Sequence, residues 1–185
     1  MYYEKNLKRM SSFYVNEVHL ITMLLPYIEG KISEDCKIHT ILQNDLEKTV
    51  NVLLERLNLK DEVKLKIKSI DWKSKTTEEC IDKEKNINNK SINYILINGD
   101  SKFISKANNV LEKLNKNNED RKLVIINCYD IIEFNKNIID ILNYTDKILN
   151  TSGEHEIEEI FPECERKKES LNINSVYIDE KNFIL

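Results

Sequence analysis

Glycine is scarce in this sequence, with three residues in a chain of 185. The phosphate loop of a nucleotide hydrolase needs clustered glycines, whose backbone N–H groups close around phosphate, and a lysine that reaches the terminal phosphate. Gly30, Gly99 and Gly153 stand singly, and the turn after the first predicted strand carries Asn16 and Glu17 instead. These residues exclude a phosphate loop and, on the same grounds, a glycine-rich dinucleotide-binding turn.

Long apolar runs and a basic surplus are also missing. No stretch approaches the roughly 18–20 apolar residues that span a bilayer, and residues 1–6 are polar, without the apolar core of a signal peptide. We therefore expect a cytoplasmic protein with no membrane contact. The net charge is −4, so nucleic acid, whose binding needs clustered positive charge, is not expected as a partner.

Cysteine is present but forms no C-x-x-C pair. The four cysteines are far apart in the sequence, which favours reduced and mostly buried thiols over a disulfide framework or a metal site. They are Cys36, Cys80, Cys128 and Cys164.

The remaining composition is that of a folded domain. Hydrophobic residues make up 41% and charged residues 32% of the chain, and this length can bury a core without covalent staples. We expect one domain over residues 1–185, with a core at 11–150 and a C-terminal α/β extension at 151–185. Abundant lysine, asparagine and isoleucine are typical of an AT-rich genome, and control of sporulation or stress is one hypothesis for such a source.

Apolar spacing in the first half predicts alternating strands and helices. Strands are expected at 11–15 and 37–42. A helix is expected at 18–32, with Asn16 as its cap and a kink or break at Pro26. A second helix is expected at 46–57, and Asn44 and Glu47 at its start have capping-box spacing.

The next segment alternates apolar residues with lysines over 63–67, which predicts a half-exposed edge strand. Residues 73–91 are polar, and we expect a short helix and a loose connection there.

The second half contains two continuous apolar runs, at 94–97 and 123–126, which are typical of central strands covered on both faces. Helical stripes follow them at 104–114 and 134–142. A short helix at 157–161 and a last strand at 176–178 complete the pattern. Strands alternating with helices of this length predict a three-layer α/β/α sandwich around a mainly parallel sheet.

Ligands in such sheets bind beyond the carboxyl ends of the strands, and the residues expected there are aromatic, amide or acidic. This mixture suits a small neutral or cationic ligand, or a protein contact, better than a phosphate. We expect neither a metal nor a cofactor. The candidate ligand-binding residues are Tyr14, Asn16, His19, Asp71, Trp72, Asn98, Asp100, Tyr129 and Asp130.

Structural roles compete with binding at several of these positions. Asp100 or Ser101 is expected more readily as a helix cap than as a ligand, and Trp72 is as plausible in the core as in a pocket. Cys128 at a strand end is interpreted as a buried thiol, because a nucleophilic cysteine needs a base, and only the fold can bring His19 near it.

Three segments of the chain resemble the MEDS family of sensory domains. The first is Phe13–Glu17 with the following Leu24–Ile28. The second is the strand and helix at Ile38–Leu57. The third is Asn127–Asp130, followed by Phe134 and Ile139–Leu142. Together these segments cover most of residues 11–150.

The resemblance implies a core similar to the RecA and KaiC ATPases without their phosphate loop. It also implies sensing of small molecules or relay of signals, often beside a DNA-binding or histidine-kinase module. This chain departs from the family in having no such module and in its short segment at 73–91.

Three functional hypotheses follow. The leading one is a stand-alone, non-catalytic regulatory protein that binds a signalling partner, such as a histidine kinase or a transcription factor, with or without a small ligand. The second is a small-molecule sensor with its pocket at the strand ends. The third is a cryptic enzyme that uses Cys128 or His19. A homodimer is a further expectation.

Overall fold

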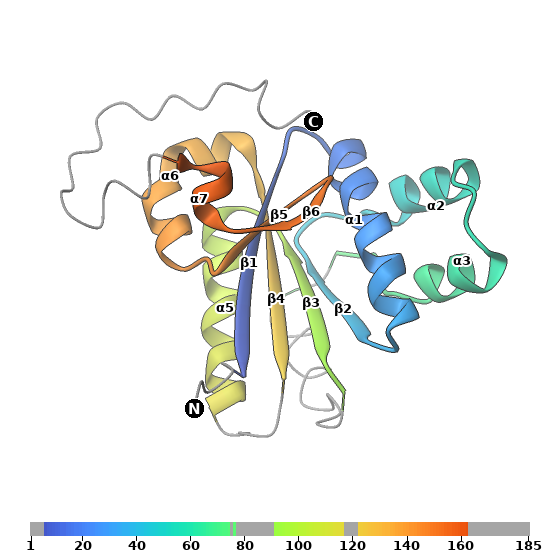
Figure 1. Ribbon diagram of the computed structural model, residues 1–185, viewed down its shortest axis with the longest axis horizontal. Helices are drawn as coiled ribbons and strands as arrows, with labels where there is room; N and C mark the ends of the chain where they lie inside the picture. Colours follow the sequence, from blue (N-terminus) through green and yellow to red (C-terminus); the bar gives the residue numbers. More distant parts are fainter. Residues whose placement is uncertain (1–5, 75, 77–90, 117–121, 163–185) are drawn as a thin grey trace.

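The computed structural model describes residues 6–74, 76, 91–116 and 122–162, and they form a six-stranded sheet with helices on both faces (Figure 1). The strand order is β2-β3-β4-β1-β5-β6, and every neighbouring pair is parallel except β5 and β6. The predicted three-layer α/β/α sandwich is confirmed. The strands are β1 (Leu7–Tyr14), β2 (Lys37–Leu42), β3 (Asn93–Asn98), β4 (Leu123–Asp130), β5 (Lys147–Asn150) and β6 (Gly153–His155).

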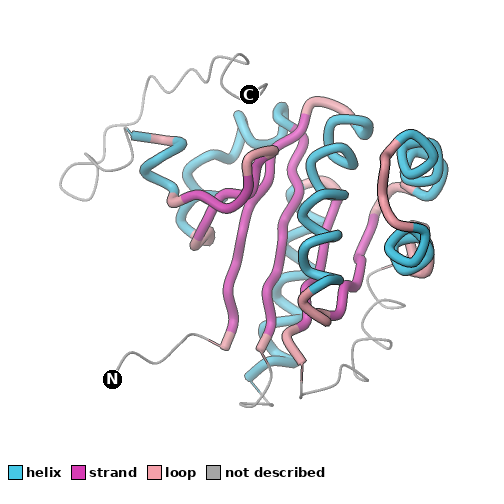
Figure 2. The backbone as a smooth tube through the Cα atoms, turned by 45° about the vertical axis from the view of Figure 1, so that its right-hand side comes forward, coloured by secondary structure: helices cyan, strands magenta, loops and turns pink. Residues whose placement is uncertain are grey.

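Helices from the first part of the chain cover one face, and later helices cover the other (Figures 1 and 2). The first face carries α1 (Glu17–Ser33), α2 (Glu47–Arg56) and α3 (Asp61–Lys68). The second carries α5 (Ser101–Lys116), α6 (Ile131–Asn143) and the short α7 (Ile157–Ile160). Among the described residues, no helix is both long and apolar enough to cross a membrane.

Alternation along the strands divides the core in two. In β1, Met10 and Tyr14 pack into the cluster under α1, whereas Phe13 packs into the cluster under α5 and α6. Successive side chains of a strand point to opposite faces, so both faces of the central strands are buried. This explains the continuous apolar runs of β3 and β4.

The pairing of β1 with β4 fixes where the connections diverge. Tyr14 and Asp130, the last residues of these strands, are register partners. From there the chain enters α1 on one face of the sheet and α6 on the other (Figure 1), so the ends of β1 and β4 form a topological switch point, the position at which open α/β sheets bind ligands in a crevice.

The predicted strand at 63–67 is wrong, because these residues belong to helix α3. Asp61 and Glu62 stand in its first turn and Lys66 and Lys68 in its last, which complements the helix dipole. Residues 63 and 67 are four apart, so they share a helical face that packs on the core, while Leu65 on the other side is 68% exposed.

Helix starts and strand ends also differ in detail from the predictions. The Asn16 cap is confirmed, since its Oδ1 accepts from the backbone N–H of His19 at 2.9 Å. Helix α1 continues through Pro26 without a break, so of the predicted kink or break only the kink stays a prediction. Before α2, the N-cap residue is Leu46 and not the predicted Asn44, and Asp45 Oδ1 accepts from the N–H of Glu47 at 2.9 Å. The predicted strand at 176–178 and most of 73–91 lie outside the described residues.

Strands β5 and β6 were not expected from the sequence. Each is short, and β6 is joined to the first helical layer by Glu154. Its carboxylate accepts hydrogen bonds from Tyr27 Oη on α1 at 2.8 Å and from Lys8 Nζ on β1 at 2.6 Å. Lys31 lies over the rings of Tyr27 and Tyr94, 5.4 and 5.6 Å from their centroids. The network therefore links β6, α1, β1 and β3.

Glu154 gives this network a pH dependence. Burial by itself raises the pKa of Glu154, but hydrogen bonds from Lys8 and Tyr27 and the charges of Lys8 and Lys31 outweigh it, so the pKa lies below its ordinary 4.5. The stabilisation is therefore fully present above the unfolded-state pKa and is lost as pH falls through the folded-state pKa.

We expect Glu154→Gln to lower the free energy of unfolding by about 1 kcal/mol at pH 7. The difference should shrink below the ordinary pKa of 4.5 as the carboxylate of the unaltered chain is protonated. Urea denaturation at pH 7, 5 and 3 measures it. Tyr27→Phe, which removes one of the two donors, should give a smaller loss. A difference that stays constant over this range would contradict the assignment.

Candidate functional site

The carboxyl edge of the sheet, defined here as residues 14–19, 43, 98–100 and 128–132, holds most of the predicted site. It brings together the ends of β1, β3 and β4, which are neighbours in the sheet. The predicted residues that lie on it are Tyr14, Asn16, His19, Asn98, Asp100, Tyr129 and Asp130.

Tyr14 and Asn98 form the buried centre of this edge. Asn98 Nδ2 donates to Tyr14 Oη at 2.8 Å and to the Cys128 carbonyl at 3.3 Å. Burial raises the pKa of Tyr14, so its hydroxyl stays protonated at neutral pH. The pair binds β1, β3 and β4 together across the α1 face.

Asp100 is held by Gln43, a residue that the sequence did not single out. The Asp100 N–H donates to Gln43 Oε1 at 2.6 Å, and Gln43 Nε2 donates to Asp100 Oδ2 at 3.1 Å. Asp100 also caps α5, accepting from the Phe103 N–H at 2.8 Å, and these bonds lower its pKa. Between them Gly99 has no room for a side chain, because a Cβ would lie 2.6 Å from Gln43 Oε1 and from Phe103.

Asp130 is also a cap. Its Oδ1 accepts from the Ile132 N–H at 2.8 Å at the start of α6. Asn16 at α1, Asp100 at α5 and Asp130 at α6 thus have the same role. Each accepts a hydrogen bond from a backbone N–H of the helix that it precedes. The cap roles explain these residue types without a ligand.

Asp71 and Trp72 lie elsewhere, which corrects their predicted place at a strand end. They follow α3 beside the edge strand β2, where the Asp71 carbonyl accepts from the Thr40 hydroxyl. Trp72 is 3% exposed, and its indole N–H donates to the Ile67 carbonyl at 2.9 Å. Trp72 therefore belongs to the core, and β3 and β4 separate β2 from the crevice at β1.

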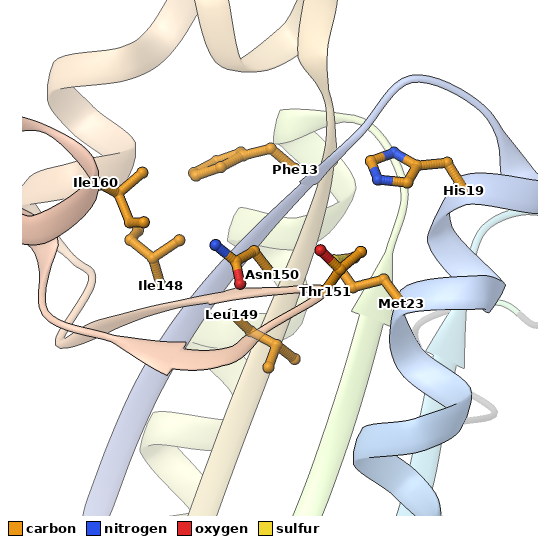
Figure 3. A pocket seen from close by; sticks show the side chains of 8 residues that line it. All are labelled: Phe13, His19, Met23, Ile148, Leu149, Asn150, Thr151 and Ile160. Carbon is orange, nitrogen blue, oxygen red and sulfur yellow. The ribbon is translucent and has the colours of Figure 1, made fainter. Parts of the chain in front are cut away.

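His19 lines a small cavity between α1 and β5 (Figure 3). Figure 3 shows His19 and Met23 on α1 opposite Asn150 and Thr151 at the end of β5. The cavity has about 10 Å³, which is barely room for one water molecule. His19 Nδ1 accepts from the Val15 N–H at 3.3 Å, and burial lowers the pKa of its imidazole.

Cys128 is a buried thiol on the α1 face. It is 1% exposed, and burial raises its pKa to about 12. At neutral pH such a thiol is almost entirely protonated, which is the opposite of what a nucleophilic cysteine needs. The Nδ1 of His19, the base considered for this thiol, accepts its hydrogen bond from the Val15 N–H and not from Cys128.

A larger cleft lies on the opposite face of the sheet, between α5 and α6. Its volume is about 630 Å³, and Arg9 from β1 with Asn127 and Tyr129 from β4 form its floor. Their odd-numbered positions place all three on the α5–α6 face of the central strands. We call this space the α5–α6 cleft.

Polar groups fill positions on this floor where a three-layer sandwich ordinarily buries apolar ones. Asn127 is 4% exposed, and its Oδ1 accepts from Asn108 Nδ2 on α5 at 2.9 Å. Arg9 pairs with Glu112 on α5 at 2.5 Å. Of the residues predicted from the sequence, Tyr129 alone lines the cleft. The available signal was Asn127, a polar residue that directly follows the apolar run 123–126, whereas Arg9 lies in a strand that also contains Lys8, Ser11 and Ser12.

Neither a metal cluster nor a known relative identifies the site. Within the described residues, no three histidine, cysteine or acidic side chains are grouped to hold a metal ion. Comparisons with family models, curated proteins and solved structures found no match to this chain.

Proposed function

We propose that this chain is a non-catalytic sensory or regulatory domain of the cytoplasm, which acts in signal transduction by binding another protein at the carboxyl edge. The observation that carries the proposal is a set of exposed apolar side chains at the point where α1 and α6 diverge. Val15 is 41%, Val18 is 55% and Ile132 is 62% exposed.

The position of these side chains supports a protein contact. Val15 follows Tyr14 and Ile132 follows Asp130 by two residues, and Tyr14 and Asp130 are register partners on adjacent strands. The apolar side chains therefore share the crevice edge where α/β enzymes hold small substrates. Exposed apolar groups rimmed by polar residues are typical of protein interaction surfaces.

The neighbouring polar groups favour this function over phosphate binding. The side-chain oxygens of Asn16, Asp100 and Asp130 accept hydrogen bonds from backbone N–H groups at helix starts. Glu17 begins α1 and accepts from the Thr49 hydroxyl at 3.1 Å. Carboxylates at this edge repel an anionic ligand.

The resemblance to the MEDS family, based on Phe13–Glu17 and Asn127–Asp130, supports the same class of function. A signalling partner such as a histidine kinase or a transcription factor fits that class. The cryptic-enzyme alternative has less support, because the Cys128 thiol is buried in the core and its raised pKa keeps it protonated.

Site-specific photo-crosslinking tests the proposed contact. A photoreactive phenylalanine analogue is placed at Val18, and separately at Leu65 on α3, which is 68% exposed but lies away from the carboxyl edge. In the cells from which the sequence comes, we expect a defined protein to be crosslinked from position 18 and not from position 65. Mass spectrometry identifies it.

Charged variants provide the second measurement. Val18→Asp and Ile132→Asp should reduce co-purification of the crosslinked protein by tenfold or more, whereas Leu65→Asp should leave it unchanged. All three positions are exposed, so the unfolding free energy should change by no more than about 0.5 kcal/mol. Equal capture from both positions, or from neither, would contradict the proposal.

A homodimer is a specific case of the same contact. Capture of a second copy of this chain from position 18 assigns the edge to self-association, and light scattering of the unaltered chain and of Val18→Asp should then give dimer and monomer masses.

A further inference from the structure

The α5–α6 cleft has the size and shape of a small-molecule site. Its volume of about 630 Å³ lies within the range usual for ligand pockets. Helix α6 is irregular where it forms the wall, because Asn137 leaves the helical conformation at φ −129° and ψ 21°. Asn137 Nδ2 donates to the Ser101 hydroxyl at 3.2 Å, which ties the two walls together at one end.

Helix α5 carries a buried amide oxygen that has no hydrogen-bond partner among the described residues. Asn108 Nδ2 donates to the Ile104 carbonyl and to Asn127 Oδ1, both at 2.9 Å. These two acceptors fix the orientation of the amide. Its Oδ1 is shielded from bulk solvent and has no hydrogen-bond partner among the described residues. An unsatisfied buried carbonyl costs about 1–3 kcal/mol, and Asn108 is among the residues that line the cleft, so turning this amide toward a hydrogen-bond donor in the cleft would relieve that cost.

The charges of the cleft oppose an anion. Among the described residues that line it, Arg9 is the one cation, and its guanidinium is already paired with Glu112 at 2.5 Å. The other charged residue in this described lining is Asp140, so these three side chains together carry one surplus negative charge. Within this described lining, a phosphate or carboxylate would meet Glu112 and Asp140 and find the guanidinium already paired.

The remaining lining groups suit a ring with hydroxyls. Serine hydroxyls and asparagine amides both donate and accept hydrogen bonds, and Ser105 and Asn109 stand exposed on the α5 wall. At the end of α6, Tyr144 is 71% exposed and lines the cleft. An aromatic ring with free faces stacks readily on the flat or apolar face of a ligand ring.

We infer that the α5–α6 cleft binds a small uncharged molecule built on a polyhydroxylated ring, of the sugar or nucleoside type. The inference does not depend on the proposed protein contact, because Val15, Val18 and Ile132, the exposed apolar residues of that contact, are not among the residues that line the cleft. It also differs from a pocket at the strand ends, where the small cavity beside His19 holds no more than about one water molecule.

Calorimetric titration of the full chain with four neutral probes tests the inference. The probes are glucose, ribose, adenosine and uridine, and their charged counterparts are glucose 6-phosphate, ribose 5-phosphate, adenosine monophosphate and uridine monophosphate. We expect at least one neutral probe to bind and its phosphorylated form to bind at least tenfold more weakly. Preference for the free sugar or for the nucleoside distinguishes the two sources of this chemistry.

Variants locate the binding in the cleft. Ser105→Trp should fill the space and abolish binding, whereas Lys106→Trp, at an exposed α5 position outside the lining, should not. Tyr144→Ala should weaken binding by about fivefold or more through loss of stacking. Circular dichroism and thermal unfolding confirm that each variant is folded.

Three results would overturn the inference. They are binding of none of the four neutral probes, equal or tighter binding of the phosphorylated probes, and unchanged binding in folded Ser105→Trp. None of them bears on the crosslinking at Val18, so failure of this inference and failure of the proposed protein contact are told apart.

Discussion

Phe134→Ala is expected to lower the free energy of unfolding by about 3–5 kcal/mol. Phe134 on α6 is fully buried. Its ring centroid lies 3.9 Å from that of Phe13 on β1 and 5.5 Å from that of Phe161 after α7. The substitution leaves a cavity at the junction of the central sheet, α6 and the C-terminal segment. Urea denaturation followed by circular dichroism measures the change.

A matched control comes from the same helix. Ile132 is 62% exposed, and Ile132→Ala should change the unfolding free energy by no more than about 0.5 kcal/mol. A loss below about 1 kcal/mol for Phe134→Ala would show that α6 does not pack on β1 as described. Because α6 forms one wall of the α5–α6 cleft, the same variant should also weaken any ligand bound there.

Trp72→Ala is expected to have an effect of similar size, about 3–5 kcal/mol. Trp72 is packed in the α1-side core with Leu46 and Leu54, and its backbone carbonyl accepts from the Leu46 N–H at 2.9 Å. Removing the ring therefore leaves a cavity in this core and destabilises the segment 71–72, which contacts the edge strand β2 at Thr40. Thermal and urea unfolding report the loss.

The conservative variant separates packing from hydrogen bonding. Trp72→Phe keeps a large ring but removes the N–H that donates to the Ile67 carbonyl, so we expect a smaller loss of roughly 1–2 kcal/mol. A tryptophan that lined an open ligand pocket would behave differently. Its replacement by alanine would change stability by less than about 1 kcal/mol.

The fold class was predictable because it depends on repeated local patterns. Two apolar runs, now β3 and β4, and the helical stripes of α1, α5 and α6 each indicated their element independently of the rest of the chain. The caps at Asn16 and Asp100 were predictable for the same reason, since a cap acts on a backbone N–H within three residues.

The spacing at 63–67 shows where a local pattern fails. Val63, Leu65 and Ile67 alternate as in a strand, yet positions 63 and 67 also share one face of a helix. Packing of that face against the α1-side core decides for the helix and leaves Leu65 in solvent. The misassigned strand then carried Asp71 and Trp72 into the predicted site, which explains both errors together.

The α5–α6 cleft could not be predicted from the sequence for a different reason. Arg9 and Asn127 are more than a hundred residues apart in the sequence, and nothing local connects Arg9, in a mixed polar segment, with Asn127 at the end of an apolar run. Parallel pairing of β1 with β4 places them on one face, and α5 then brings Asn108 and Glu112 to them.

The sequence alone determined that this chain has no phosphate loop, since glycine scarcity and the acidic turn at Glu17 are properties of the residues themselves. It also determined the α/β alternation, because hydrophobic spacing is local. Only the tertiary structure decided what the strand ends do. Long-range strand pairing buries Tyr14 and Asn98 as a hydrogen-bonded pair, and Asp100 caps α5 beside them. The same fold leaves Val18 exposed at this edge and forms a polar cleft on the other face of the sheet.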